Sequence, residues 1–307
     1  MSMRTLPTLL LATGLALAMD SAVAQSQASK PAEYGQAAAA STEVVQRPDG
    51  ATIHYEVSGQ GTPMLLIHGY PLSGELFAKN REALSKQFKV ITLDQRGFGQ
   101  SKTPNSEASV KTYAEDAFAV MDALKIDKAI IGGMSMGGPV ALEMYRQSPE
   151  RFKGMMLIDT TANPAIPPEA GLWNGMATLV QDKGVSALPP VLLKDMLTGE
   201  TRLAKKPVVS TLEGIIKQAS KEAAIAGAHV LANRPDSRPT LPTIKVPTLI
   251  IVGVADTIYP PAMATAMEEA IPNATLKMID GAAHAAVIEK PDQVNQSILD
   301  WAKVTKW

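Results

Sequence analysis

Short aliphatic runs alternate with longer segments of helical periodicity from Thr42 onward, and this order limits the possible folds more than any other feature of the sequence. Several runs are continuously apolar, as parallel strands buried on both faces should be. The predicted strands are residues 52–57, 64–67, 90–93, 129–131, 155–158, 249–252 and 276–279. The predicted helices are residues 113–124, 139–147, 261–270 and 291–303. The alternation predicts an α/β fold in which helices flank a mostly parallel sheet.

The alternation is interrupted between about residues 163 and 246. Proline-rich stretches there (NPAIPPE, ALPP and RPDSRPTLP) flank amphipathic helical segments such as residues 209–228. A second independent domain is one interpretation of this region. Because strands of the same character resume afterwards, a helical lid inserted into one sheet needs fewer assumptions. We therefore expect one domain over residues 42–307, with a lid at about 163–246.

The amino-terminal segment is typical of an export signal. Arg4 gives a positive start, residues 6–19 are almost wholly apolar, and AVA offers a small-residue cleavage site after Ala24. A membrane anchor is the alternative, but the apolar run is shorter than the ~20 residues that a spanning helix needs. The sequence therefore predicts a signal peptide over residues 1–24 and a protein that is periplasmic or secreted, with no stable membrane anchor.

Composition narrows the possible partners. The chain is 46% hydrophobic and 19% charged with a net charge of -1, which is ordinary for a soluble globular protein. It has no basic cluster interleaved with aromatic residues, so nucleic acid is not an expected partner. The absence of cysteine excludes disulfides and thiol catalysis, and four histidines without an H-E-x-x-H motif give a metal site little support. Residues 25–41 are Ala/Ser/Gln-rich and predict a flexible leader. Composition leaves the oligomeric state open.

A candidate nucleophile, Ser135, stands at the centre of the G-x-S-x-G motif within GGMSMGG. An aliphatic run precedes the motif and a helical segment follows it, which is the context that the motif requires. A sharp turn from strand to helix strains the backbone at the serine and brings the two elements close together. Residues two before and two after the serine must then lack side chains, and Gly133 and Gly137 meet that requirement.

The loop after the predicted strand 64–67 reads HGYP. In acyl transfer, backbone N–H groups commonly hold the oxyanion, one from the residue after the nucleophile and one from this loop. The predicted donors are therefore the N–H groups of Met136 and Tyr70. His68 lies beside the strand-end glycine, where a structural role is more common than a catalytic one.

Two residues downstream complete a candidate triad. Asp256 and His284 each follow a predicted strand, and the order Ser, Asp, His is that of α/β hydrolases. In this arrangement His284 is the base and Asp256 orients the imidazole. Asp159, which follows the predicted strand 155–158, is the alternative acid because its loop could also approach the histidine.

These motifs, with LLIHGYP and the loop DQRGFGQS at residues 94–101, make the chain resemble the α/β-hydrolase superfamily over nearly everything after the leader. Within it the chain most resembles small bacterial esterases, perhydrolase-type non-haem haloperoxidases and 3-oxoadipate enol-lactonases. The resemblance implies an enzyme without a cofactor, whose lid shapes the acyl and alcohol pockets. It also implies that DQRGFGQS is structural, with Arg96 fixing the loop. Related dehalogenases and epoxide hydrolases carry aspartate where Ser135 stands.

The expected activity is hydrolysis of a small-molecule carboxylic ester or lactone through an acyl-enzyme at Ser135. Cleavage of C–C, amide or thioester bonds and perhydrolysis use the same residues, so the motifs do not separate these reactions. A binding protein on an inactive hydrolase fold is an alternative of another class. Its usual mark is a missing triad residue, and here all three positions are filled.

Overall fold

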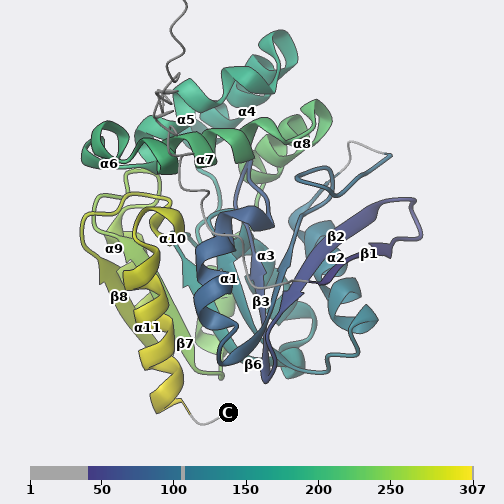
Figure 1. Ribbon diagram of the computed structural model, residues 1–307, viewed down its shortest axis with the longest axis vertical. Helices are drawn as coiled ribbons and strands as arrows, with labels where there is room; N and C mark the ends of the chain where they lie inside the picture. Colours follow the sequence, from purple (N-terminus) through teal and green to yellow (C-terminus); the bar gives the residue numbers. More distant parts are fainter. Residues whose placement is uncertain (1–40, 105–107, 306–307) are drawn as a thin grey trace, which may run out of the picture. The chain divides into compact units, whose positions relative to one another are not determined.

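The computed structural model describes residues 41–104 and 108–305, and Figure 1 shows their arrangement. The predicted signal peptide over 1–24 and residues 25–40 of the predicted leader lie outside the described residues. Ser41, which the sequence assigned to the leader, is the first residue of a strand.

The described residues form an eight-stranded sheet with the order β1-β2-β4-β3-β5-β6-β7-β8. Strand β2 is antiparallel to both of its neighbours, and the remaining pairs are parallel. The strands are β1 (Ser41–Gln46), β2 (Thr52–Ser58), β3 (Thr62–Ile67), β4 (Phe88–Leu93), β5 (Ala129–Met134), β6 (Phe152–Ile158), β7 (Thr248–Gly253) and β8 (Ala274–Ile279). The prediction of a mostly parallel α/β sheet is confirmed.

Burial along the strands explains which of them the sequence could predict. Every residue of β5 and β7 is buried, and both strands are continuously apolar except for Thr248 and the glycines. Over residues 274–277, edge strand β8 alternates between partly covered and exposed residues, as a strand covered on one face should. Strand β1 at the other edge is almost wholly exposed, so it has no apolar pattern and was not predicted.

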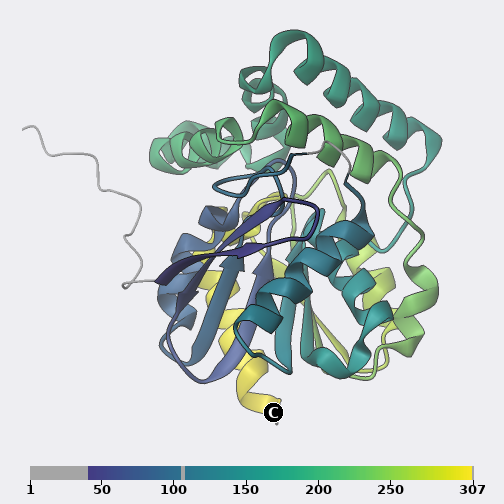
Figure 2. The same cartoon turned by 90° about the vertical axis from the view of Figure 1, so that its right-hand side faces the viewer.

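Helices cover both faces of the sheet. Helix α1 (Ala78–Leu84) packs with α11 (Pro291–Val304) on one face, and α2 (Val110–Ala123) packs with α3 (Gly137–Gln147) on the other (Figure 2). Helix α9 (Pro261–Ala270) packs against β7 and β8. Four 3₁₀ helices are also present among the described residues: η1 (Gly74–Phe77), η2 (Pro149–Arg151), η3 (Val185–Ala187) and η4 (Arg238–Thr243).

Five helices between β6 and β7 stack above one edge of the sheet (Figures 1 and 2). We call this group the lid: α4 (Pro167–Lys183), α5 (Pro189–Met196), α6 (Gly199–Ala204), α7 (Lys206–Lys217) and α8 (Lys221–Ala232). Ala285, in the loop after β8, donates to the carbonyl of Met196 at the end of α5, so the lid covers the carboxyl ends of the strands.

The expectation of one helical segment over residues 209–228 is wrong. The chain forms two helices there, because Ser220 caps α8 by accepting a hydrogen bond from the backbone N–H of Ala223 at 3.0 Å. No helix in the described part of the chain is long and apolar enough to cross a membrane.

Candidate active site

Ser135 occupies the sharp turn between β5 and α3. Its φ of 53° is in the left-handed region, which non-glycine residues rarely adopt. The neighbouring glycines make the turn possible: a Cβ on Gly133 would lie 2.0 Å from the carbonyl oxygen of Gly137, and a Cβ on Gly137 would lie 2.3 Å from that of Ile67. The backbone strain and the need for both glycines are therefore as the motif predicts.

Two hydrogen bonds to β6 and the residues after it hold the strained backbone of Ser135. Its N–H donates to the carbonyl of Ile158 at 3.0 Å. Its carbonyl accepts from the hydroxyl of Thr160 at 2.6 Å. These partners hold the peptide groups on both sides of Ser135 in the strained conformation.

Ser135, His284 and Asp256 form one chain of hydrogen bonds, and all three residues are buried. Nε2 of His284 lies 2.8 Å from Oγ of Ser135, and Nδ1 lies 2.8 Å from Oδ2 of Asp256. A carboxylate only accepts, so Nδ1 donates to Asp256 and Nε2 is left to accept from the serine hydroxyl. The structure thus brings together the three side chains that the sequence selected.

The carboxylate of Asp256 is held by its own loop. Oδ1 accepts from the backbone N–H groups of Ile258 at 2.8 Å and Tyr259 at 3.0 Å, which leaves Oδ2 for the imidazole. The ring of Tyr259 also lies edge-on to that of His284, with centroids 5.5 Å apart. Burial raises the pKa of Tyr259, so its phenol stays neutral beside the imidazole.

Asp159, the alternative acid, has different partners. Its Oδ1 accepts from the N–H of Gly253 at 2.8 Å and its Oδ2 from the N–H of Ala286 at 3.1 Å. Burial, followed by the nearby charge of Asp256, raises its pKa well above the usual value. Asp159 therefore joins the end of β7 to the start of the helix that follows the loop after β8, while the imidazole pairs with Asp256.

The predicted oxyanion donors lie on two loops that meet at Ser135. A Cβ on Gly69 would be 2.7 Å from Cβ of Ser135, so the loop after β3 runs directly against the turn. Within residues 41–104 and 108–305, the backbone N–H groups of Tyr70 and Met136 have no acceptor. Both donors are thus free for a ligand.

His68 uses both ring nitrogens for structure. The backbone N–H of Gln95 donates to its Nε2 at 2.9 Å, so Nδ1 carries the proton and donates to the carbonyl of Gly69 at 2.8 Å. Burial lowers the pKa of His68, which keeps the ring neutral. The ring therefore joins the loop after β3 to the loop after β4, in agreement with the structural role expected for it.

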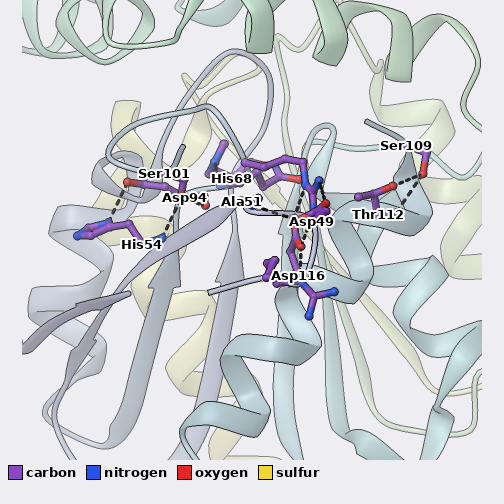
Figure 3. A network of polar contacts seen from close by, with 12 residues as sticks. Asp49, Ala51, His54, His68, Asp94, Ser101, Ser109, Thr112 and Asp116 are labelled. Carbon is purple, nitrogen blue, oxygen red and sulfur yellow. Dashed lines mark hydrogen bonds and ion pairs between the residues drawn. The ribbon is translucent and has the colours of Figure 1, made fainter. Parts of the chain in front are cut away.

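Figure 3 shows the polar network that fixes the loop at residues 94–101. Asp94 accepts from the N–H of Gly74 at 2.7 Å, the N–H of Gln100 at 2.8 Å and Nδ1 of His54 at 2.9 Å. Burial opposes its ionisation, but these hydrogen bonds outweigh burial and lower the pKa of Asp94.

Arg96 also anchors that loop, two residues after Asp94. Its guanidinium donates twice to Asp116 of α2, at 2.7 and 2.8 Å, and once to Asp49 in the turn after β1, at 2.7 Å. Both ion pairs hold the loop against the rest of the domain, and neither contacts Ser135, Asp256 or His284. This arrangement agrees with the structural role expected for Arg96.

The remaining histidine lies in the lid, where Nδ1 of His229 is 3.1 Å from Oδ1 of Asn174 on α4. In the part of the chain that the structure describes, no three histidine, aspartate or glutamate side chains are grouped so that they could hold a metal ion.

Three residues near the triad were not selected from the sequence. Thr160 holds the backbone of Ser135, Tyr259 packs against the imidazole of His284, and Glu289 accepts from the N–H of Ala283 at 2.7 Å. Each acts through a backbone group or a ring contact, and contacts of this kind have no recognisable pattern in the sequence. Nearness to Asp256 along the chain is the one signal that could have pointed to Tyr259.

A comparison with protein families matches residues 62–291 to the α/β-hydrolase fold family. The chain belongs to this family. The α/β hydrolase is 32% identical to a thermophilic esterase from Thermogutta terrifontis, with a TM-score of 0.82 over 88% of this chain and 100% of the esterase. It is 28% identical to 3-oxoadipate enol-lactonase 2 of Acinetobacter baylyi, over 80% of this chain and 91% of the lactonase.

The α/β hydrolase is also similar to a bromoperoxidase from Bacillus anthracis. The two are 25% identical, with a TM-score of 0.78 over 86% of this chain and 100% of the bromoperoxidase. The expected resemblance to esterases, haloperoxidases and enol-lactonases is therefore confirmed.

Proposed function

We propose that this α/β hydrolase cleaves a carboxylic ester or lactone through an acyl-enzyme at Ser135. The observation that carries the proposal is the chain of two 2.8 Å contacts that joins the hydroxyl of Ser135, the imidazole of His284 and the carboxylate of Asp256. The similar proteins named esterase and enol-lactonase support this class of reaction.

In the first half of the reaction, Oγ of Ser135 attacks the substrate carbonyl while its proton passes to Nε2 of His284. The negative oxygen that develops receives hydrogen bonds from the free N–H groups of Tyr70 and Met136. Asp256 keeps the proton on Nδ1 and stabilises the imidazolium. The imidazolium then returns its proton to the departing alkoxide, which leaves the acyl group on Ser135.

In the second half, His284 takes a proton from water, and the resulting hydroxide attacks the acyl-enzyme. The tetrahedral intermediate uses the same two N–H donors. When it collapses, the proton on His284 returns to Oγ of Ser135 and the carboxylic acid is released. For a lactone, the alcohol and acid products are the two ends of one molecule.

Thioester, amide or C–C cleavage and perhydrolysis would begin with the same serine. A non-catalytic binding protein is less well supported, because the hydrogen-bonded triad is complete. A panel of p-nitrophenyl esters of rising chain length, with lactones and an amide alongside, measures which bond is cleaved. Preference for an ester or lactone supports the proposal. Turnover of the amide alone would contradict it and identify amide cleavage as the reaction.

Covalent labelling with a fluorophosphonate tests the nucleophile directly. We expect one adduct, located at Ser135 by mass spectrometry of peptides, and none on the Ser135→Ala variant. A wild-type protein that is not labelled and turns over none of the esters would favour a binding function.

We also propose that the α/β hydrolase is exported and cut after Ala24, because residues 1–24 have the pattern of a signal peptide. The test is the amino terminus of the protein recovered from a bacterial host that expresses the full chain. A protein that begins at Gln25 and lies outside the cytoplasm supports export. A protein that keeps residues 1–24 in the cytoplasm contradicts it.

A further inference from the structure

Glu289 closes α10 (Ala286–Glu289) and is only 1% exposed, yet its carboxylate is fully hydrogen-bonded. Oε1 accepts from the backbone N–H of Thr198 at 2.8 Å and from its hydroxyl at 2.6 Å. Oε2 accepts from the backbone N–H of Ala283 at 2.7 Å. Thr198 belongs to the lid, and Ala283 is the residue before His284. One side chain thus joins the lid to the histidine loop.

A second contact joins the same two segments. The N–H of Ala285, the residue after His284, donates to the carbonyl of Met196 in the lid at 2.9 Å. The residues on both sides of His284 are therefore tied to the stretch between α5 and α6, one through Glu289 and one directly. The lid therefore holds the N–H of Ala285 directly and the N–H of Ala283 only through Glu289, while the core holds the N–H of Ala286 through Asp159.

The chemistry of Glu289 suits this task better than that of any neutral side chain. An ionised carboxylate only accepts hydrogen bonds, and all three groups around it donate. A glutamine in its place would turn an NH₂ group toward at least one of these donors. Hydrogen bonds to a charged group are also about twice as strong as neutral ones, so the carboxylate holds both segments firmly.

We propose that Glu289 is a positioning residue that makes the placement of the His284 imidazole depend on the closed lid. This proposal rests on the function proposed above. When the stretch around Thr198 moves away, Glu289 loses both of its contacts with Thr198 and Ala285 loses its contact with Met196. The residues on either side of His284 are then held less firmly, and Nε2 can leave its position 2.8 Å from Oγ of Ser135. Ser135 is therefore fully activated only beneath a closed lid, where water is excluded from the reaction.

The first experiment compares Glu289→Gln with Glu213→Gln. Glu213 is an exposed residue of α7 that pairs with Lys217, so its variant makes the same chemical change in the lid without touching the histidine loop. The rate of fluorophosphonate labelling should fall roughly tenfold or more in Glu289→Gln, because small misplacements of reacting groups carry large rate costs. Glu213→Gln should stay within about twofold of the wild type.

The second experiment approaches the link from the lid. Thr198→Val removes the hydroxyl that donates to Glu289 and also the cap on the N–H of Thr201, whereas Thr198→Ser keeps both. Ser220→Ala removes a comparable cap from α8 alone. We expect slower labelling in Thr198→Val, near wild-type labelling in Thr198→Ser, and near wild-type labelling in Ser220→Ala despite a lower melting temperature. If Glu289→Gln does not fold, the comparison of Thr198→Val with Thr198→Ser still tests the proposal.

Steady-state kinetics on a short p-nitrophenyl ester separate positioning from substrate binding. Because Glu289 acts through the histidine loop, kcat should fall in Glu289→Gln while KM stays within about twofold. Adding Thr198→Val to Glu289→Gln should lower kcat little further, since both changes break the same link. Wild-type labelling rates in both Glu289→Gln and Thr198→Val, or a change in KM alone, would overturn the proposal. A wild-type protein that is not labelled at Ser135 refutes the proposed function itself.

Discussion

At the level of single residues, each side chain of the Ser135–His284–Asp256 chain is hydrogen-bonded to the next, and Asp256 is held by its own loop as well. Asp256 accepts two backbone N–H groups on one oxygen and the imidazole on the other. Because a carboxylate oxygen only accepts hydrogen bonds, Oδ2 fixes the proton on Nδ1 of His284. The acid therefore acts by selecting the tautomer whose free nitrogen faces Ser135.

Asp256→Asn should lower kcat by about four orders of magnitude, because an amide can turn its NH₂ toward Nδ1 and select the wrong imidazole tautomer. Asp159→Asn should lower kcat much less, since its oxygens contact Gly253 and Ala286 rather than the imidazole. Steady-state turnover of one ester by both variants measures the ranking. The reverse ranking would transfer the role of the acid to Asp159.

Asp159→Asn should change how stability depends on pH. Burial and the charge of Asp256 raise the pKa of Asp159, so the folded protein keeps a proton that the unfolded chain has already lost. In the wild type the retained proton stabilises the fold, and this stabilisation declines as pH rises from the ordinary pKa of an aspartate toward the raised pKa of Asp159. Asparagine does not titrate, so the variant lacks this decline. Urea unfolding across that range should therefore show the wild type losing stability relative to the variant. Parallel curves would contradict the raised pKa.

A pair of glycine substitutions tests the packing beneath Ser135. Gly133→Ala should destabilise the fold by more than about 3 kcal/mol, because the new Cβ would meet backbone at 2.0 Å and neither segment can move away. Gly175→Ala in α4 is the matched control. Its Cβ meets nothing within 4 Å, so it should stabilise the helix by about 0.5–1 kcal/mol. Unfolding midpoints in urea measure both changes.

Spacing along the chain was enough to select Ser135, Asp256 and His284, because the carboxyl ends of parallel strands meet at one edge of a sheet. The same reasoning left Asp159 as a rival, since it also follows a strand. Only the directions of the side chains separate the two acids. Glu289 could not be predicted, because its partners are backbone groups of segments far apart in the sequence.

At the level of elements, the lid is attached at two places: to the histidine loop, and to the loop after β7 that carries Asp256, called the acid loop below. The attachment to the histidine loop consists of the link from Thr198 to Glu289 and the hydrogen bond from Ala285 to Met196. The other is Arg234, just after α8, which donates to both oxygens of Glu169 on α4 at 2.7 Å. The guanidinium of Arg234 also lies 5.5 Å from the centre of the Tyr259 ring. Movement of α4 is therefore coupled to the acid loop, as movement of α5 and α6 is to the histidine loop.

Glu169→Gln should loosen the first turn of α4. It replaces a bidentate ion pair to a buried guanidinium with a single neutral acceptor, which should cost about 1–3 kcal/mol. Hydrogen–deuterium exchange should become faster in residues 167–183 before it changes in the sheet. Glu213→Gln, which breaks an exposed pair on α7, should leave exchange in α4 unchanged. Equal effects of the two variants would show that the pair with Arg234 has no special role.

At the level of the whole molecule, the sheet was predictable because its central strands are buried and apolar. The edge strand β1 was not predictable, since it is exposed and lacks the pattern that marks a buried strand. The division of the lid was also missed: hydrophobic spacing runs through residues 209–228, and a single capping serine, Ser220, decides where one helix ends and the next begins. Periodicity therefore locates the layers of this fold better than the junctions within them.

The exposed face of α4 also makes lid motion open to direct observation. Leu172 on α4 is 69% exposed and Val44 on β1 is 53% exposed, and the chain has no native thiol. Cysteines introduced at these two positions would be the sole attachment points for a pair of spin labels. Dipolar spectroscopy would then report the distribution of distances between lid and sheet, with and without a phosphonate bound to the serine.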